Sequence, residues 1–339
     1  MPSPSQPDHE PKPDTTPTTP TSGTPKRLLI TGVAGFLGAH VAQVAAQAGW
    51  AVVGATRSMP ASTIAAAERV VAADLAEPGA ARDAIETLAP DAVIHCAANA
   101  RTNECEKSPE AAERDNVLAT RLLAQACASD GHGVPLVVCS TDLVFDGERP
   151  NHKQPGMYTE RDEPNPINAY GRSKLAMERM LGEMASHAII ARLPLLFGPP
   201  ADASGKPSFL GGWVEHLRRG EALVLFTDEW RTPLSARDAA RGLLACLARG
   251  EPGATYHLAG AERINRYELG LRFARHGGDV LGFDASLLQP GVRADVPMPA
   301  PRAADVSLDG ARAQRELGFT PGALDDELAW TARAMAALA

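Results

Sequence analysis

No stretch of this sequence stays apolar for long. Its 339 residues contain no uninterrupted apolar run close to the roughly 20 residues that a membrane-spanning helix needs. The first residues also lack the basic and then apolar arrangement of a secretory signal. We therefore expect no membrane partner and a cytoplasmic location.

Cysteine and positive charge are also scarce. The cysteines are Cys96, Cys105, Cys127, Cys139 and Cys246. None forms a Cys-x-x-Cys pair or stands at metal-ligand spacing from a histidine, so we expect no metal site and reduced thiols that pack as small apolar side chains. The net charge of -8 disfavours a nucleic-acid partner, which needs a basic surface.

The sequence begins with a segment unlike the rest. Residues 1–25 are mostly proline, threonine, serine and charged residues, which bury too little apolar surface to offset the entropy of ordering. We predict a disordered tail there. The chain as a whole is 44% hydrophobic and 22% charged, and its length suits one large domain with a smaller second one.

Beyond residue 25, short apolar runs alternate with segments of helical periodicity. The apolar runs are 28–30, 51–55, 69–72, 92–95, 136–139 and 188–193. The helical segments are 39–48, 111–129, 169–185, 209–219, 236–249, 267–276, 311–317 and one near the end. Strands that are buried on both faces read as continuous apolar runs, so the pattern predicts an α/β fold with a Rossmann-like, doubly wound parallel sheet.

A glycine-rich turn follows the first apolar run. Residues Thr31–Gly38 read TGVAGFLG and open the first helical segment. Glycines at this turn let a pyrophosphate approach the backbone N–H groups of a helix N-terminus, where the dipole favours anions. The turn therefore predicts a dinucleotide site. Its candidate contacts are Gly32, Gly35, Phe36, Leu37 and Gly38.

The composition changes near residue 199, where proline, glycine and short segments begin to dominate. We predict an NAD(P)-binding Rossmann domain over 26–198. A smaller C-terminal substrate-binding lobe is predicted over 199–339, allowing for a strand or helix that returns to the first domain.

The end of the second strand indicates which cofactor binds. An acidic side chain there would bond the adenosine ribose and favour NAD, but this chain has Arg57 with Thr56 and Ser58 beside it. An arginine can bind a 2′-phosphate, so NADP (NADPH) is favoured over NAD. After the third strand, Asp74 and Leu75 are placed to flank the adenine, although Asp74 can equally cap a helix.

Tyr170 and Lys174 stand four residues apart at the start of a helical segment, which puts both on one face. An ammonium group beside a phenol should lower the pKa of the tyrosine, which can then pass a proton to a carbonyl oxygen. The lysine can also bond the nicotinamide ribose. Thr141 follows the buried run at 136–139 and can hold the substrate oxygen, or it can cap a turn.

Taken together, these residues resemble the extended short-chain dehydrogenase/reductase superfamily, and within it the dTDP-4-dehydrorhamnose reductases and their sugar-nucleotide-binding relatives. The resemblance runs from Lys26 to nearly the end of the chain. Its markers are Thr31–Gly38, Ser140–Gly147 (STDLVFDG), Tyr170–Lys174, Arg231-Thr232-Pro233, and Arg302–Leu308 ahead of Leu317-Gly318-Phe319.

The resemblance assigns roles to single residues. It implies that Thr141, Tyr170 and Lys174 are the catalytic trio, with Tyr170 and Lys174 also touching the cofactor, and that Asn116 supports them. It further implies that Ala97 and Ala98 line the cofactor. Arg231 and Arg302 match positions that hold the substrate diphosphate in relatives, which suits the fork of a guanidinium group.

The resemblance also implies an activity: NADPH-dependent reduction of a keto group on a nucleotide-linked sugar. Relatives often form homodimers through two helices that correspond here to 111–129 and 169–185. This chain departs from the reductases at Leu143, where they have tyrosine, and at Thr102-Asn103-Glu104, where they have Val-Asp-Lys, although Glu106 fits. These substrate-side departures leave the sugar unidentified.

Two other functions stay open at this point. One is an NAD-dependent sugar-nucleotide epimerase or dehydratase, which Arg57 disfavours; dehydratases of the superfamily also have an Asp-Glu pair where this chain has Asp142-Leu143. The other is a non-catalytic, NADP-binding regulatory subunit that resembles the β subunit of methionine adenosyltransferase. The presence of all three catalytic residues favours an enzyme over that subunit.

Overall fold

The protein is described by a computed structural model. The structure describes residues 25–60, 63–128, 133–148, 156–184, 186–201 and 205–338. All of the predicted N-terminal tail except Pro25 lies outside the described residues. The ends of the predicted helices at 129 and 185 also lie outside them.

A seven-stranded sheet forms the centre of the larger domain, and every pair of neighbouring strands in it is parallel. Its order is β11-β6-β5-β4-β1-β2-β3. The strands are β1 (Arg27–Thr31), β2 (Ala51–Thr56), β3 (Arg69–Ala72), β4 (Ala92–His95), β5 (Leu136–Thr141), β6 (Ile189–Leu193) and β11 (Thr255–His257). The predicted doubly wound parallel sheet is confirmed.

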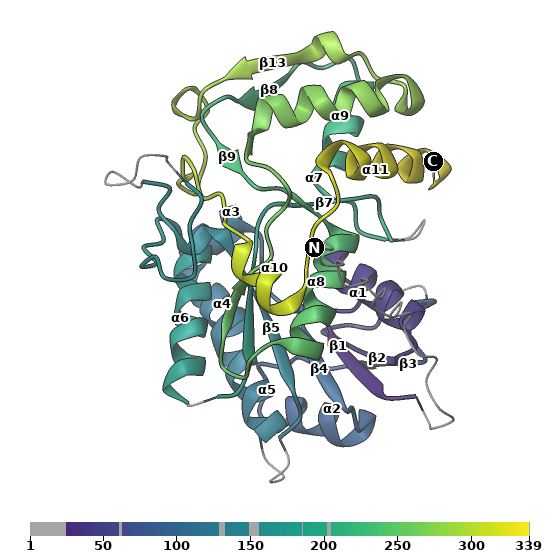
Figure 1. Cartoon of the computed structure of the whole chain (residues 1–339), viewed down its shortest axis with the longest axis vertical. Coiled ribbons are helices and arrows are strands. Elements are labelled where there is room, and N and C mark those ends of the chain that lie inside the picture. Colours follow the sequence, from purple (N-terminus) through teal and green to yellow (C-terminus); the bar gives the residue numbers. More distant parts are fainter. Residues whose placement is uncertain are drawn as a thin grey trace, which may run out of the picture.

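Helices cover both faces of the sheet (Figure 1). The helices of this domain are α1 (Phe36–Gln47), α2 (Ala80–Leu88), α3 (Thr102–Lys107), α4 (Pro109–Glu113), α5 (Ala119–Ala128), α6 (Ala169–Glu183), α8 (Ala236–Arg249) and α10 (Ala311–Leu317). In β1, Leu28 and Ile30 pack with α1 and α8, while Leu29 packs with α2, α5 and α6. Alternate side chains of one strand thus fill two separate cores.

The smaller lobe has its own apolar core above the sheet (Figure 1). Its main elements are α7 (Phe209–Arg218), β8 (Leu223–Phe226), α9 (Arg266–Leu281), β13 (Leu288–Gly291) and α11 (Leu324–Leu338). Two-residue strands join it to the rest: β7 (Leu196–Phe197), β9 (Trp230–Arg231), β10 (Leu234–Ser235) and β12 (Ile264–Asn265). Within the described residues, short 3-10 turns lie at Asp142–Val144, Ala285–Leu287 and Arg293–Asp295. Trp213 is buried in the lobe core.

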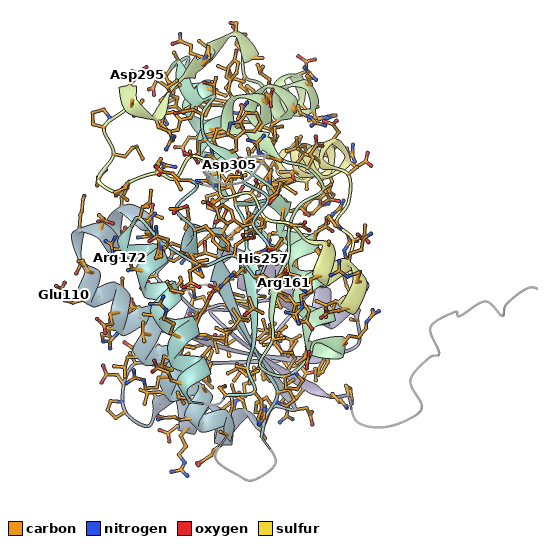
Figure 2. The ribbon with its side chains drawn as sticks, turned by 60° about the vertical axis from the view of Figure 1, so that its left-hand side comes forward. Glu110, Arg161, Arg172, His257, Asp295 and Asp305 are labelled. Carbon is orange, nitrogen blue, oxygen red and sulfur yellow. The ribbon has the colours of Figure 1, made fainter. Side chains whose placement is uncertain are left out.

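The chain passes between the two parts several times. From the segment predicted as the lobe, β11 pairs with β6, and α8 packs on α1. Near Asp305 the chain returns from the lobe to the sheet domain (Figure 2), where Tyr158 pairs with Leu308. The carboxyl ends of the strands therefore face the lobe, which is where an open α/β sheet binds ligands.

Candidate active site

The glycine turn brings two backbone segments close together. Gly32 has a φ of +68°, and a Cβ on it would lie 2.8 Å from the backbone N and Cα of Ala97. A side chain at this position would therefore clash as well as strain the turn. A Cβ on Gly38 would clash with the Gly32 carbonyl oxygen. The turn ends at Gly35, the N-cap of α1, and leaves backbone N–H groups for a phosphate.

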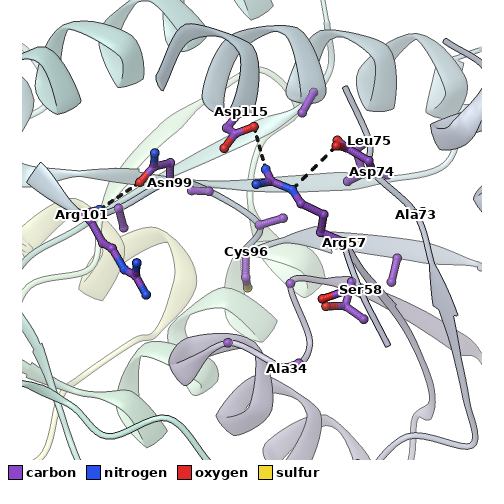
Figure 3. Close-up of a pocket in the computed structure, with 18 of the residues that line it drawn as sticks. Ala34, Arg57, Ser58, Ala73, Asp74, Leu75, Cys96, Asn99, Arg101 and Asp115 are labelled. Atoms are coloured by element: carbon purple, nitrogen blue, oxygen red, sulfur yellow. Dashed lines mark hydrogen bonds and ion pairs between the residues drawn. The ribbon is translucent and has the colours of Figure 1, made fainter. Parts of the chain in front are cut away.

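A cavity of about 430 Å³ opens beside this turn (Figure 3). It follows the carboxyl ends of β1 to β4 and is lined by many of the predicted cofactor contacts. These are Gly32, Gly35, Arg57, Asp74, Leu75, Ala97 and Ala98. Phe36, Leu37 and Gly38 do not line it but form the first turn of α1. A glycine cradle at one end and Arg57 at the other fit a dinucleotide whose phosphates lie at the turn.

Arg57 lies at the rim of this cavity with 61% of its side chain exposed. Its Nη2 is 2.6 Å from Oδ1 of Asp115, and its Nε is 3.8 Å from Oδ2 of Asp74 (Figure 3). Arg114 donates to Asp74 at 2.9 Å and holds the pKa of that carboxyl below its usual value. Asp74 also accepts from the Ala76 N–H in the loop after β3, but it does not cap α2, whose N-cap is Gly79.

Thr141 and Tyr170 meet at the other end of the sheet edge. Thr141 is the last residue of β5 and donates to Oδ1 of Asp142 at 3.1 Å. Tyr170 belongs to the first turn of α6, where its phenol lies near enough to Thr141 for that side chain to lower its pKa. Asn168 caps α6 by accepting from the Gly171 N–H at 2.8 Å, which fixes where the tyrosine stands. Both side chains are buried, with Tyr170 9% exposed.

The expected fall in the pKa of Tyr170 is wrong for this structure. Burial raises that pKa well above its ordinary value, and the nearby Asp142 carboxylate raises it further. The ammonium of Lys174 lies 3.4 Å from Sδ of Met177 and near the thiols of Cys96 and Cys139. Burial lowers the pKa of Lys174. Because its own pKa is raised, Tyr170 keeps its proton at neutral pH.

Asn116 connects the cofactor cavity to the catalytic helix. It lies in a π-helical turn, Arg114–Leu118, which interrupts the helix predicted over 111–129. Its side chain accepts from the Asn99 N–H at 2.8 Å and donates to Oγ of Ser173 at 2.9 Å. Asn99 lines the cavity and Ser173 belongs to α6, so this amide holds the two together. Such π turns often occur at functional sites.

Arg231 and Arg302, the predicted diphosphate ligands, lie around one buried carboxylate. Nη2 of Arg231 is 3.5 Å from Glu229, and Nη1 of Arg302 is 3.2 Å from it. Arg266 adds a third guanidinium group, with its Nε 3.9 Å away. Burial alone would raise the pKa of Glu229, but the three arginines outweigh it and the pKa lies below its usual value.

Several residues of the site were not predicted. Asp115 pairs with Arg57, and Lys206 reaches the cofactor cavity from the lobe. Glu229 and Arg266 complete the arginine cluster. Glu229 stands only two residues before Arg231 in the sequence, which was the one available signal. Nothing in the spacing of the sequence links Arg266 or Lys206 to these sites.

None of the described helices is long and apolar enough to cross a membrane. Within the described ranges, no group of three or more histidine, cysteine and acidic side chains is placed to hold a metal ion. All five cysteines are free. The homodimer, the cytoplasmic location, the domain boundary and the individual site roles stay predictions.

The chain has relatives of similar length. It is 34% identical over 301 residues to the protein named Probable low-salt glycan biosynthesis reductase Agl14 of Haloferax volcanii, which covers 89% of this chain and 95% of that one. It is 31% identical over 282 residues to methionine adenosyltransferase 2 subunit beta of Xenopus tropicalis, covering 78% of this chain and 75% of that one.

Crystal structures share the fold. A dTDP-4-dehydrorhamnose reductase of Clostridium acetobutylicum matches with a TM-score of 0.75 and 25% identity, over 90% of this chain and 98% of that chain. DesIV, a dTDP-glucose 4,6-dehydratase of Streptomyces venezuelae with NAD bound, matches with a TM-score of 0.74 and 26% identity, over 91% and 96%. The Bacillus anthracis dTDP-4-dehydrorhamnose reductase in complex with NADP, 22% identical with a TM-score of 0.76 over 91% and 99%, shows the fold alone.

The family resemblance inferred from the motifs is confirmed by a match that spans nearly all of the described chain. The family described as RmlD substrate binding domain matches residues 26–336. Together with the 34% identity to a relative over most of its length, this places the protein in a known group. The chain belongs to the RmlD substrate-binding family of extended short-chain dehydrogenases/reductases.

Proposed function

We propose that this protein is an NADPH-dependent reductase that converts a keto group on a nucleotide-linked sugar into a hydroxyl group. The observation that carries the proposal is the buried, protonated Tyr170 beside Thr141 at the carboxyl edge of the sheet. A phenol that keeps its proton until the substrate arrives is suited to act as a general acid.

Three side chains have different roles at the reacting carbonyl. Thr141 orients the carbonyl oxygen, and Tyr170 donates its proton to that oxygen. Lys174 stands one helical turn after Tyr170 and contributes a positive charge on the same helix face. NADPH, when bound, supplies the hydride that reaches the carbonyl carbon, so that C=O becomes CH–OH.

The choice of substrate class rests on the arginine cluster beyond Thr141. Arg231 and Arg302 present guanidinium groups on the lobe side of the catalytic pair, and such groups bind diphosphates in paired, charge-assisted hydrogen bonds. The Haloferax relative is named a reductase of glycan biosynthesis, and the Clostridium structure is a reductase of a dTDP-linked keto sugar. Both names agree with the proposed chemistry.

The choice of NADPH over NADH rests on Arg57. Its exposed guanidinium group can turn from Asp115 towards a 2′-phosphate, and Ser58 lines the cavity beside it. The acidic residue that would bind a free ribose 2′-hydroxyl is absent from the end of β2. The dehydratase that holds NAD shows that this fold also accepts the other cofactor.

The test is NADPH oxidation, followed by loss of nicotinamide absorbance, with a panel of dTDP- and UDP-linked 4-keto sugars. We expect turnover with at least one sugar, and we expect Tyr170→Phe to lower kcat by about 100-fold or more because the proton donor is gone. Tyr256→Phe is the matched control: its hydroxyl accepts from the Glu251 N–H and does not face Thr141. It should keep wild-type turnover.

Two results would contradict the proposal. Oxidation that survives in Tyr170→Phe would mean that another group supplies the proton. Tight NADPH binding without oxidation on any panel member would instead favour a regulatory subunit, as in the methionine adenosyltransferase relative.

A further inference from the structure

Two cysteines lie side by side near the carboxyl ends of β4 and β5. The Sγ atoms of Cys96 and Cys139 are 3.8 Å apart. Cys139 belongs to β5, and Cys96 follows directly after β4. His95 pairs with Val138 in the parallel ladder, so each cysteine comes one residue after a paired position on its strand. Side chains at such matching positions leave the same face of the sheet, and strand register therefore makes the two thiols neighbours.

The backbone geometry of this pair suits a disulfide. Neighbouring strands of a sheet lie about 4.8 Å apart, and the Cα atoms of a disulfide are usually about 4.4 to 6.8 Å apart. The sulfur atoms would have to approach each other to about 2.05 Å. Rotation about the side-chain bonds and a small shift of one strand end are enough for this.

One of the two thiols faces the cofactor cavity and the other lies behind it. Cys96 is half-buried and lines the cavity (Figure 3). Cys139 is buried in the apolar core on the side of α1 and α8. A small oxidant that enters the cavity therefore meets Cys96 first. A dinucleotide that fills the cavity covers the same thiol.

The charges around Cys96 determine when its thiol reacts. The hydrogen bond from the Cys139 thiol and burial raise the pKa of Cys96, while the nearby ammonium group of Lys174 acts in the opposite direction. The thiol is therefore mostly protonated at neutral pH. Because the thiolate is the nucleophile, oxidation of Cys96 should become faster as the pH rises.

We propose that Cys96 and Cys139 form a redox-active dithiol, which hydrogen peroxide oxidises to a disulfide when the cofactor cavity is empty. The Cys96 thiolate attacks one peroxide oxygen, so that an S–O bond forms, the O–O bond breaks and the other oxygen leaves as water after taking up a proton. The Cys139 sulfur then attacks the Cys96 sulfur, the S–S bond forms and a second water leaves. The two sulfurs lose two electrons, which reduce the peroxide.

The disulfide should weaken cofactor binding. Cys139 is held in the ladder by its pairing with Ala191 of β6, whereas Cys96 lies just beyond the paired part of β4. Closing the gap between the sulfurs therefore moves mainly Cys96 and the next residue, Ala97. A Cβ on Gly32 would lie only 2.8 Å from the Ala97 backbone, so this segment already touches the glycine turn. A shift there should weaken NADPH binding by about tenfold.

The first measurement maps disulfides in the full-length, cofactor-free protein after treatment with hydrogen peroxide. Remaining thiols are blocked with iodoacetamide, the protein is digested without reduction, and the peptides are identified by mass spectrometry. We expect a pair of peptides joined through Cys96 and Cys139 that dithiothreitol separates. At about ten times its Kd, NADP⁺ should slow the formation of this link by about tenfold, because few cavities are then empty.

Three variants show which thiols take part. Cys139→Ser removes the second thiol, so the sulfenic acid on Cys96 should persist and be captured by dimedone. Cys127→Ser is the matched control, because Cys127 is buried in the core on the other face of the sheet and should not affect the link. Cys246→Ser tests the other thiol in the same core as Cys139, and it should also leave the link unchanged.

The possible results separate the parts of this inference. Absence of the link after peroxide treatment, or a link from Cys139 to Cys246 in its place, would overturn the dithiol. A link that forms equally fast with NADP⁺ bound would overturn the role of the empty cavity. Equal NADPH affinity of the oxidised and the reduced protein, measured by calorimetry, would overturn the effect on the cofactor.

The effect on NADPH rests on the proposed function, whereas the disulfide itself depends on neither cofactor nor sugar. Reduced protein that fails to bind NADPH would therefore overturn the proposed function, while the mapping of the link would still decide whether the dithiol exists. Reduced protein that turns over a keto sugar but forms no link would overturn the dithiol and leave the reductase intact.

Discussion

Asp142 holds its charge at a cost to the fold. Burial raises its pKa to about 6 from 3.8, although Arg231 acts in the opposite direction. In the unfolded chain the carboxyl loses its proton near 3.8, and in the folded chain near 6. Between these values the folded state binds the proton more tightly. The stability from this group is therefore complete below about pH 3.8 and is lost as the pH rises through 6.

Asp142→Asn should stabilise the protein at pH 8. The shift between 3.8 and about 6 corresponds to roughly 3 kcal/mol at about 1.4 kcal/mol per pKa unit, and an amide never takes on the charge. We expect the melting temperature of the variant to exceed that of the wild type at pH 8. The difference should shrink steadily as the pH falls towards 4.

Asp146→Asn provides a control with the opposite sign. Burial raises the pKa of Asp146, but hydrogen bonds from the Glu148 N–H, Asn165 and Tyr158 outweigh it and the pKa lies below its usual value. Its charge therefore favours folding, and the amide should lower the melting temperature at pH 8. If Asp142→Asn also lowers the melting temperature at pH 8, the Asp142 carboxylate is stabilised in the fold and the argument from burial is wrong.

At the scale of elements, α6 depends on one buried ion pair. Glu178 lies one turn beyond Lys174 and accepts from Nη2 of Arg192 at 2.7 Å and from its Nε at 3.0 Å. Ser140 also donates to the same carboxylate. Both charged side chains are 7% exposed. The pair fixes the catalytic helix against β5 and β6.

Removing one charged side chain of this ion pair should lower the free energy of unfolding more than removing both. Arg192→Met leaves Glu178 buried and unpaired, and we expect it to lower the free energy of unfolding by about 3 to 5 kcal/mol. Combining it with Glu178→Leu should recover most of that loss, because no uncompensated charge remains. Urea unfolding of the single and double variants measures both. A double variant as unstable as the single one would show that packing, and not charge, is what Arg192 supplies.

Some elements were readable from the sequence and others were not. The apolar runs 69–72 and 92–95 became β3 and β4 with the predicted bounds, and 311–317 became α10. These elements follow local apolar patterning, which a sequence displays directly. The prediction for α9 stopped at residue 276, just before Gly277-Gly278. The helix continues to Leu281, since both glycines are buried, and it ends at Gly282 with a φ of +68°.

Site residues could be predicted from the sequence only where they belong to a local motif. Gly32, Tyr170 and Lys174 lie in short patterns whose spacing carries the chemistry. The π turn at Asn116 was not predicted, because one extra residue in a helical turn leaves the apolar periodicity almost unchanged. Arg266 meets Glu229 only because β12 pairs with β9 in three dimensions. No pattern of neighbouring residues encodes that contact.

At the scale of the whole molecule, the cofactor cavity draws on both parts of the fold. The strands β1 to β4 supply most of its lining, and Lys206 reaches it from the segment that leads to the lobe. A ligand that binds only the folded state stabilises that whole assembly, by about 2.7 kcal/mol at a concentration of 100 times its Kd. The rise in melting temperature therefore measures how tightly each cofactor binds in the cavity, without any need for turnover.

NADPH should raise the melting temperature more than NADH does at the same concentration, because only NADPH offers a 2′-phosphate to Arg57. Arg57→Ala should remove this difference by reducing the effect of NADPH to that of NADH. Arg101→Ala is the matched control, since Arg101 also lines the cavity with an exposed side chain but pairs with Glu104; it should keep the difference. Equal stabilisation of the wild-type protein by the two cofactors would mean that Arg57 stays with Asp115 when the cofactor binds. The carboxylates of Asp74 and Asp115 would then cancel the charge of Arg57, and the proposed preference for NADPH would be wrong.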